Sequence, residues 1–249
     1  MARSALYQQV ASELRRAIYS GDYGPGAQLP TEEELRQRHG VSRNTVRLAV
    51  AELVNEGLVT RAPRRGTIVR ERRALLMHPQ RELQRRPTGE PREAFAYAVS
   101  QEGRAPSQHI DVLALVPAEE IASRLELGDG DLALVRRRLR FVDGQPYNTN
   151  DSYFPFELVG GSEIARQGDI KRGANRVLEE LGHAQVRVVD DIWARMPNQS
   201  EVDRLQLELG TPVVVYVRVG YDRSDMPVRV AVSVLPADKH LIRYELDVS

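Results

Sequence analysis

Apolar positions in the first third of the chain recur at helical spacing. The first stripe predicts a helix over residues 5–20 and consists of Leu6, Val10, Leu14, Ala17 and Ile18. The loop GDYGPG then ends that helix. In LPTEEEL, Thr31 is followed three residues later by Glu34, a spacing that predicts a capping box at the start of a short second helix. Gly40 ends this second helix.

A third stripe starts after Ser42, a favourable N-cap residue, and predicts a helix over residues 42–56. Its apolar positions predict a face toward a core: Val46, Ala49, Val50, Leu53 and Val54. The segments LVTR and TIVR then flank APRRG, which predicts a two-stranded hairpin with Arg64 and Arg65 at its tip. Helix, short helix, turn, helix and hairpin together predict a winged helix-turn-helix domain over residues 1–71.

The rest of the chain predicts a linker and a second domain. Residues 72–92 carry six Arg and three Pro with little periodicity, which indicates a partly extended linker. Beyond it, residues 116–155 resemble residues 196–236: each segment has Pro, Arg seven residues later, Leu-x-Leu, Gly, a strand, a turn and two closing prolines nine residues apart. Unless the match is coincidental, residues 93–249 form a pseudo-symmetric domain of antiparallel hairpins, and the fold class is α+β with two domains.

The charge distribution separates the same two regions. The chain holds 35 Lys and Arg against 35 Asp and Glu, so its formal net charge is zero. Residues 1–92 hold 17 Arg against 10 acidic residues, hence +7, and residues 93–249 hold 18 basic against 25 acidic residues, hence −7. A basic first third suits a polyanionic partner. The alternative is a chance asymmetry on solvated faces.

Composition excludes several classes of protein. No apolar run approaches the roughly 18 residues of a membrane span, and the segment MARSALYQQV lacks a signal-peptide core. The absence of Cys excludes disulfides, thiolate catalysis and cysteine-ligated zinc. We therefore expect a cytoplasmic protein without a membrane partner.

The first turn of the third helix is polar and basic, and consists of Ser42, Arg43, Asn44, Thr45 and Arg47. A helix that presents its first turn fits the major groove of B-DNA, where Arg reads guanine and Asn reads adenine. Free backbone N–H groups at this end also favour phosphate. Arg64 and Arg65 would reach the phosphate backbone or the minor groove. The alternative is an ordinary amphipathic helix with a solvated polar face.

At these residues the chain resembles the DNA-binding domain of GntR-type bacterial regulators. The resemblance is carried by the I-x-x-G-x-x-x-P-G-x-x-L-P loop, the V-S-R-x-T-V-R-x-A helix start, L-x-x-E-G-L-V and R-G-T-x-V in the hairpin. It implies contacts with double-stranded operator DNA from Ser42, Arg43, Asn44, Thr45, Arg47, Arg65 and Gly66. The family often places Arg where this chain has Glu33, which puts one phosphate contact in doubt.

A strand in the second domain carries three arginines. Strand alternation places Arg136, Arg138 and Arg140 on one face, where they could receive a carboxylate or phosphate. The alternative is an exposed edge strand balanced by acidic residues. After the following turn, polar side chains that could line a pocket are Asn148, Asn150, Ser152 and Tyr153. The first three lie on one face, and the alternative is that Asn148 and Asn150 bind no ligand.

This second region is similar to the effector-binding domain of the HutC subgroup. The resemblance rests on VRRRLRFVDGQPYNTNDSYFP and implies a chorismate-lyase-like fold that binds a small metabolite and thereby loosens the protein from DNA. Arg138 and Arg140 match the R-x-R before the D-G-x-P turn. The chain has Asn150 and Arg229 where the family commonly has Glu, which favours an anionic effector over the commonest amino-sugar phosphate.

No pattern indicates an enzyme, a cofactor or a metal site. The chain lacks a G-x-S-x-G elbow, a P-loop and H-E-x-x-H, and its five His are scattered. Adjacent residues Asp190 and Asp191 would point to opposite faces of a strand and are interpreted as solvated. We predict a homodimeric regulator, most simply a repressor released from a palindromic operator by its effector. The alternative is a DNA-binding protein whose second domain only dimerises or binds a protein partner.

Overall fold

The computed structural model describes residues 2–70, 74–82, 94–170 and 172–246. It forms two compact units: unit 1 contains Met1–Arg73 and Met196–Pro212, and unit 2 contains Ala74–Arg195 and Val213–Ser249. The division differs from the predicted one, because residues 74–82 of the expected linker belong to unit 2 and residues 196–212 belong to unit 1. Within the described ranges, no helix has the length and apolar character needed to cross a membrane.

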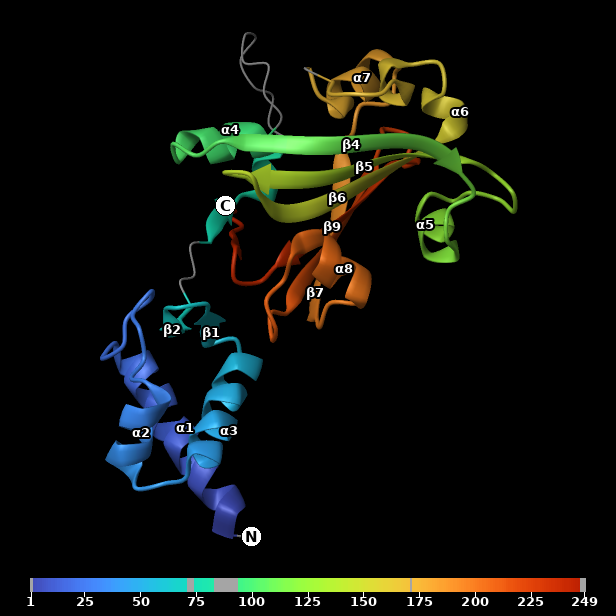
Figure 1. Cartoon of the computed structure of the whole chain (residues 1–249). Helices are drawn as coiled ribbons and strands as arrows, with labels where there is room; N and C mark the ends of the chain where they lie inside the picture. Colours follow the sequence, from blue (N-terminus) through green and yellow to red (C-terminus); the bar gives the residue numbers. More distant parts are fainter. Residues whose placement is uncertain (1, 71–73, 83–93, 171, 247–249) are drawn as a thin grey trace. The chain divides into compact units, whose positions relative to one another are not determined.

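Unit 1 contains the predicted helices and hairpin (Figure 1). They are α1 (Ala2–Ser20), α2 (Glu32–His39), α3 (Arg43–Asn55), β1 (Val59–Ala62) and β2 (Gly66–Val69). The Thr31 side chain accepts from the backbone N–H of Glu34, and the Glu34 carboxylate accepts from the backbone N–H of Thr31, so the predicted capping box is confirmed. Gly40 adopts the left-handed conformation with φ 62° that ends α2.

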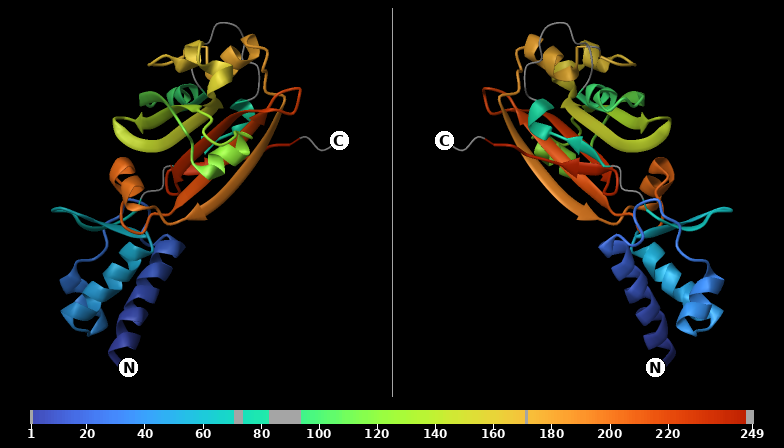
Figure 2. Two further views of the ribbon diagram at one scale, coloured as in Figure 1. Left: turned by 90° about the vertical axis from the view of Figure 1, so that its right-hand side faces the viewer. Right: turned by 90° about the vertical axis from the view of Figure 1, so that its left-hand side faces the viewer.

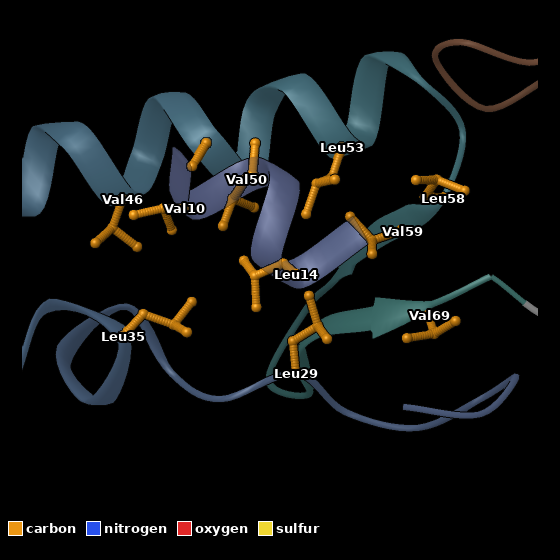
Figure 3. Packing of buried hydrophobic residues seen from close by; sticks show 12 residues of the cluster. Val10, Leu14, Leu29, Leu35, Val46, Val50, Leu53, Leu58, Val59 and Val69 are labelled. Atoms are coloured by element: carbon orange, nitrogen blue, oxygen red, sulfur yellow. The ribbon is translucent and has the colours of Figure 1, made fainter. Parts of the chain in front are cut away.

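The core of unit 1 lies between the helices and the hairpin (Figure 3). Val10 and Leu14 of α1 point toward Val46, Val50 and Leu53 of α3, and all five are at most 3% exposed. Burial of each such side chain stabilises the fold by about 1.5–3 kcal/mol, which holds α3 by its apolar face and leaves its opposite face outside the core.

A short segment from far along the chain completes unit 1. It contains α8 (Gln199–Leu205), which starts at a capping box formed by Asn198 and Glu201. Arg70, directly after β2, donates to Thr211 Oγ1 at 2.6 Å and to the Leu209 carbonyl at 3.0 Å. Charge-assisted hydrogen bonds of this kind hold the segment to the end of the hairpin.

Unit 2 is built on a six-stranded antiparallel sheet in the order β4-β5-β6-β9-β8-β7. Its strands are β4 (Pro106–Leu115), β5 (Ala133–Val142), β6 (Gln145–Pro155), β7 (Arg187–Arg195), β8 (Val213–Tyr221) and β9 (Pro227–Pro236). The halves β4-β5-β6 and β7-β8-β9 meet at β6 and β9. In the sequence each half has a short helix between its first two strands: α5 follows β4, and α8, which belongs to unit 1, follows β7. The predicted internal repeat is therefore confirmed.

Each face of the sheet has its own cover, which can be followed from opposite sides in Figure 2. On one face, Leu134 and Phe154 pack with residues of α6 (Phe156–Val159), η2 (Glu163–Ala165) and α7 (Ala174–Glu180). On the other face, Val217 and Val230 pack with α5 (Glu119–Arg124). Since strand residues alternate in direction, the arginine-bearing face of β5 is the one below α6, η2 and α7.

The described part of the expected linker is ordered secondary structure. It contains β3 (Leu75–Met77) and the 3₁₀ helix η1 (Pro79–Glu82), and α4 (Ala94–Gln101) follows. β3 pairs in parallel with β10 (His240–Ile242), close to the C-terminal end of the chain. Residues 83–92 of the expected linker lie outside the described residues.

Candidate nucleic-acid interface and polar sheet site

The first turn of α3 is fixed by its own hydroxyl groups. Ser42 Oγ accepts from the Thr45 backbone N–H at 3.2 Å and lies 2.8 Å from Thr45 Oγ1. Thr45 is only 8% exposed, whereas Ser42 is exposed. Ser42 therefore caps the helix, and its hydrogen bonds with Thr45 give the turn a fixed geometry.

The larger side chains of this turn are accessible. Arg43, Asn44 and Arg47 are exposed, and the Arg43 side chain retains 76% of its accessible surface. Arg43 Nε lies 3.3 Å from Glu32 Oε2, an exposed ion pair that is weak in water. Among the described residues, no side chain pairs with Arg47. The N-terminal end of α3 thus presents two cations and an amide beside free backbone N–H groups.

The hairpin tip adds further cations. Arg64, Arg65 and Gly66 are all exposed, and no side chain of the described residues pairs with either arginine. Arg64 and Gly66 have positive φ values of 63° and 76°, which turn the chain sharply between β1 and β2. Gly66 also allows close approach, since a Cβ there would lie 3.1 Å from Gln28 Nε2. The turn holds both arginines at the end of the hairpin.

Glu33 lowers the positive charge available on α2. Its carboxylate accepts from Arg36 Nε at 2.8 Å and from Gln37 Nε2 at 2.8 Å. The hydrogen bond from Arg36 is the main reason that the pKa of Glu33 falls to about 2. Because Arg36 is paired with Glu33, α2 offers less positive charge to a phosphate, in line with the doubt about a contact at this position.

On unit 2, the predicted polar residues gather on one face of the sheet. The cross-strand pairs are Arg136 with Ser152, Arg138 with Asn150, and Arg140 with Asn148. β5 lies between β4 and β6, so the alternative of an exposed edge strand is wrong.

Two predicted effector residues have surroundings that differ from those of the others. Arg136 is fully buried, and its guanidinium donates to the carbonyls of Ile164 (2.8 Å), Arg166 (2.8 Å) and Gly168. These hydrogen bonds hold the segment from η2 to Gly168 against the sheet. Tyr153 lies on the opposite face, because it pairs with Val135 and Val230 and packs against the core there.

Two guanidinium groups converge on Ser152. Arg138 Nη1 lies 3.3 Å from Ser152 Oγ and 3.5 Å from Asn150 Oδ1, and Arg229 Nη2 donates to Ser152 Oγ at 2.9 Å. Arg229 also donates to Asn175 Oδ1 at 2.9 Å. Arg138, Asn150 and Ser152 are 5%, 7% and 0% exposed. Arg138 is buried and Arg229 is half-buried, so two guanidinium groups meet at one hydroxyl on this face of the sheet.

Asn148 and Arg140 continue this row. Asn148 Nδ2 lies 3.0 Å from His240 Nε2, and His240 Nδ1 lies 2.9 Å from the Pro236 carbonyl. Burial lowers the pKa of His240 to about 4, so the ring is neutral at pH 7, with its proton on Nδ1 toward the carbonyl and Nε2 accepting from Asn148. The Arg140 guanidinium lies 4.9 Å from the Phe95 ring centroid.

A further buried arginine, Arg218, was not among the predicted site residues. Arg218 on β8 is 4% exposed and forms a bidentate ion pair with Asp190, at 2.7 Å to Oδ1 and 2.8 Å to Oδ2. The interpretation of Asp190 as solvated is thus wrong, because its side chain is 13% exposed. Burial alone would raise the pKa of Asp190, but hydrogen bonds from Arg218 and Tyr244 lower it below its ordinary value. Asp191 points to the other face and pairs with Arg124.

Two family models match the chain. Residues 6–69 match the model described as bacterial regulatory proteins, gntR family, and residues 101–240 match the UTRA domain. An HTH-type transcriptional regulator of Rhizobium meliloti, RB1450, is 31% identical over 97% of this chain and 95% of its own length. The HTH-type transcriptional repressor NagR of Bacillus subtilis is 27% identical over the same shares of the two chains.

Solved structures have the same two-domain organisation. A crystal structure of a GntR-family transcriptional regulator superimposes with a TM-score of 0.70 at 25% identity and covers 98% of both chains. PhnF from Mycobacterium smegmatis has a TM-score of 0.59 at 23% identity and covers 96% of this chain and 100% of its own, which supports the fold alone. All these relatives with a described role are transcriptional regulators, in agreement with the prediction that the chain is not an enzyme.

Proposed function

The chain belongs to the GntR family of bacterial regulatory proteins and carries a UTRA domain behind its helix-turn-helix domain, and from this premise we propose that it is a cytoplasmic homodimeric repressor. It binds a palindromic operator and leaves it when a small anionic effector binds unit 2. The family membership makes it a DNA-binding transcriptional regulator. The repression, the operator symmetry, the dimer and the charge of the effector are parts of the proposal.

The accessible end of α3 carries the DNA-binding part of the proposal. Arg43, Asn44 and Arg47 are exposed at a helix N-terminus whose apolar face is buried, which is the arrangement that a major-groove reader needs. Arg64 and Arg65 supply phosphate contacts from the hairpin. The test is a fluorescence-anisotropy titration of the purified protein with duplex DNA from its own promoter region. Affinity that does not fall as salt rises would contradict the proposal.

The convergence of Arg138 and Arg229 on Ser152 carries the effector part. Both guanidinium groups lie within hydrogen-bond distance of Ser152 Oγ, and an anionic ligand bound at this point would gain charge-assisted hydrogen bonds. Thermal-shift measurements with panels of organic phosphates and carboxylates test this, with Arg138→Gln as the control variant. If no anion stabilises the wild-type protein, the anionic assignment is wrong. If uncharged metabolites also fail to stabilise it, the alternative of a domain that only dimerises or binds a protein partner is favoured.

A homodimer would match the symmetry of a palindrome. Edge strand β7 supports it, because Val189, Ile192 and Trp193 are 39%, 43% and 40% exposed there, and such apolar side chains are stabilised by a partner surface. Repression is supported by the similarity to NagR of Bacillus subtilis, which is a transcriptional repressor. The effector acts only as far as it prefers the conformation that does not bind DNA. Light scattering and footprinting test the dimer and the palindrome: a monomeric mass or an asymmetric single half-site footprint would contradict them.

A further inference from the structure

The two halves of the sheet place an arginine at the same position. Arg138 on β5 and Arg218 on β8 occupy equivalent places in the two repeat units, and both are buried, at 5% and 4% exposure. They lie on the same face of the sheet, since Arg138 is opposite Asn150, Asn150 is opposite Ser233, and Ser233 is opposite Tyr216, two residues before Arg218. The repeat has thus produced two buried cations on one surface.

The neighbouring edge strands differ at the equivalent position. Arg138 is opposite Ile110 on β4, whereas Arg218 is opposite Asp190 on β7. Asp190 meets the Arg218 guanidinium with both carboxylate oxygens, which is the bidentate geometry that a bound carboxylate ligand adopts with arginine. The second half of the domain therefore has a carboxylate of its own chain at the position where the edge strand of the first half has Ile110.

The Arg218–Asp190 pair also holds two distant segments. Arg218 Nη1 donates to the Pro79 carbonyl at 2.9 Å, and Pro79 begins η1 in the segment that follows the winged domain. Tyr244 donates from its hydroxyl to Asp190 Oδ2 at 2.6 Å. Between these contacts, β3 and β10 pair in parallel. The Arg218–Asp190 ion pair therefore binds two segments, one that begins η1 at Pro79 and one that contains Tyr244 after β10.

We propose that Asp190 is the internal occupant of a second, pseudo-symmetric anion site, and that Arg218 and Asp190 are positioning residues for the segment 74–82. Fixing this segment restricts the chain that connects the winged domain to the sheet. The restriction sets how readily two winged domains reach successive half-sites, a consequence that rests on the proposed function. The positioning itself does not, because it concerns contacts within unit 2.

The test removes the internal anion and supplies another. Asp190→Ala deletes the carboxylate but keeps Cβ, so formate has the size and charge to replace it. By hydrogen–deuterium exchange, we expect amides of residues 75–82 and 240–244 to exchange about tenfold faster in the variant, while those of β5 and β6 stay protected. Formate should restore protection relative to chloride at equal ionic strength. Asp225→Ala is the matched control. It also removes a carboxylate that is paired with an arginine of β7, Arg187, but Asp225 is exposed.

Unchanged exchange in the folded variant, or acceleration that formate does not reverse, overturns the proposal. If Asp190→Ala does not fold, Tyr244→Phe and the near-isosteric Asp190→Asn carry the same test, with faster exchange in the two segments as the expected result. Operator affinity measured on the same proteins should change several-fold in Asp190→Ala and recover with formate. Absence of any operator binding by the wild type would defeat the proposed function, whereas the exchange experiment would still decide the role of Arg218 and Asp190.

Discussion

Arg47 and Arg43 should differ in how much operator affinity they contribute, although both lie in the first turns of α3. Arg47 has no side-chain partner among the described residues, so a contact with guanine would be gained without losing another. Replacing it with Ala should cost about 1–3 kcal/mol of specific binding, or roughly 5- to 150-fold in Kd. Arg43 must first leave Glu32, and an exposed pair of this kind is worth up to about 1 kcal/mol. Arg43→Ala should therefore cost less than Arg47→Ala by up to this amount.

The assay is an anisotropy titration of each variant against the operator and a scrambled duplex at one salt concentration. Glu32→Gln should strengthen operator binding by up to about fivefold, because Arg43 then has no pair to break. Arg223→Ala is the control, since it removes one exposed positive charge outside the winged domain. Equal losses on operator and scrambled DNA would refute the base-reading role. A larger loss for Arg43→Ala than for Arg47→Ala would refute the reasoning from the Glu32 pair.

Four further outcomes follow from the structure. Arg65→Ala should reduce the slope of log affinity against log salt by roughly 0.9, and an unchanged slope would exclude a phosphate contact. Arg138→Gln should leave operator binding intact and abolish release by effector; loss of DNA binding with the fold intact would contradict the site assignment. His240 has a folded pKa of about 4, below its ordinary value of 6.5, so the unfolded chain takes up a proton first and stability falls as pH drops from about 6.5 toward 4. Urea unfolding of wild type and His240→Gln between pH 7 and 5 should show the difference, and parallel pH profiles would refute it. Leu53→Ala removes a side chain that is 0% exposed in the core of unit 1 and should cost about 2–5 kcal/mol in unfolding free energy, measured by thermal denaturation; a loss below 1 kcal/mol would contradict the packing.

The winged domain could be predicted closely because its signals are local. Thr31 with Glu34, Gly40 and the hairpin around Arg64 each depend on residues within a few positions, and the structure retains all of them. The internal repeat could also be predicted, because residues 116–155 and 196–236 carry the same residue types in the same order. Strand alternation then placed the arginines of β5 on one face correctly.

The remaining features depend on contacts between residues far apart in sequence. Arg136 donates to carbonyls about thirty residues away, in the segment from η2 to Gly168, so its burial could not be predicted from its own strand. Asp190 lies 28 residues from Arg218, and only alignment of the repeats would have paired Arg218 with Arg138. Alternation along β6 alone already places Tyr153 on the other face of the sheet from Asn150 and Ser152.

The pairing of β3 with β10 also affects how the protein is made. β3 starts at residue 75, and its partner strand ends at residue 242 of 249. During synthesis α1, α2, α3 and the hairpin emerge first, whereas β3 can pair with β10 only after residue 242 has left the ribosome. A chain that ends before β10 would therefore contain the residues of α3 and the hairpin, but β3 would have no partner strand.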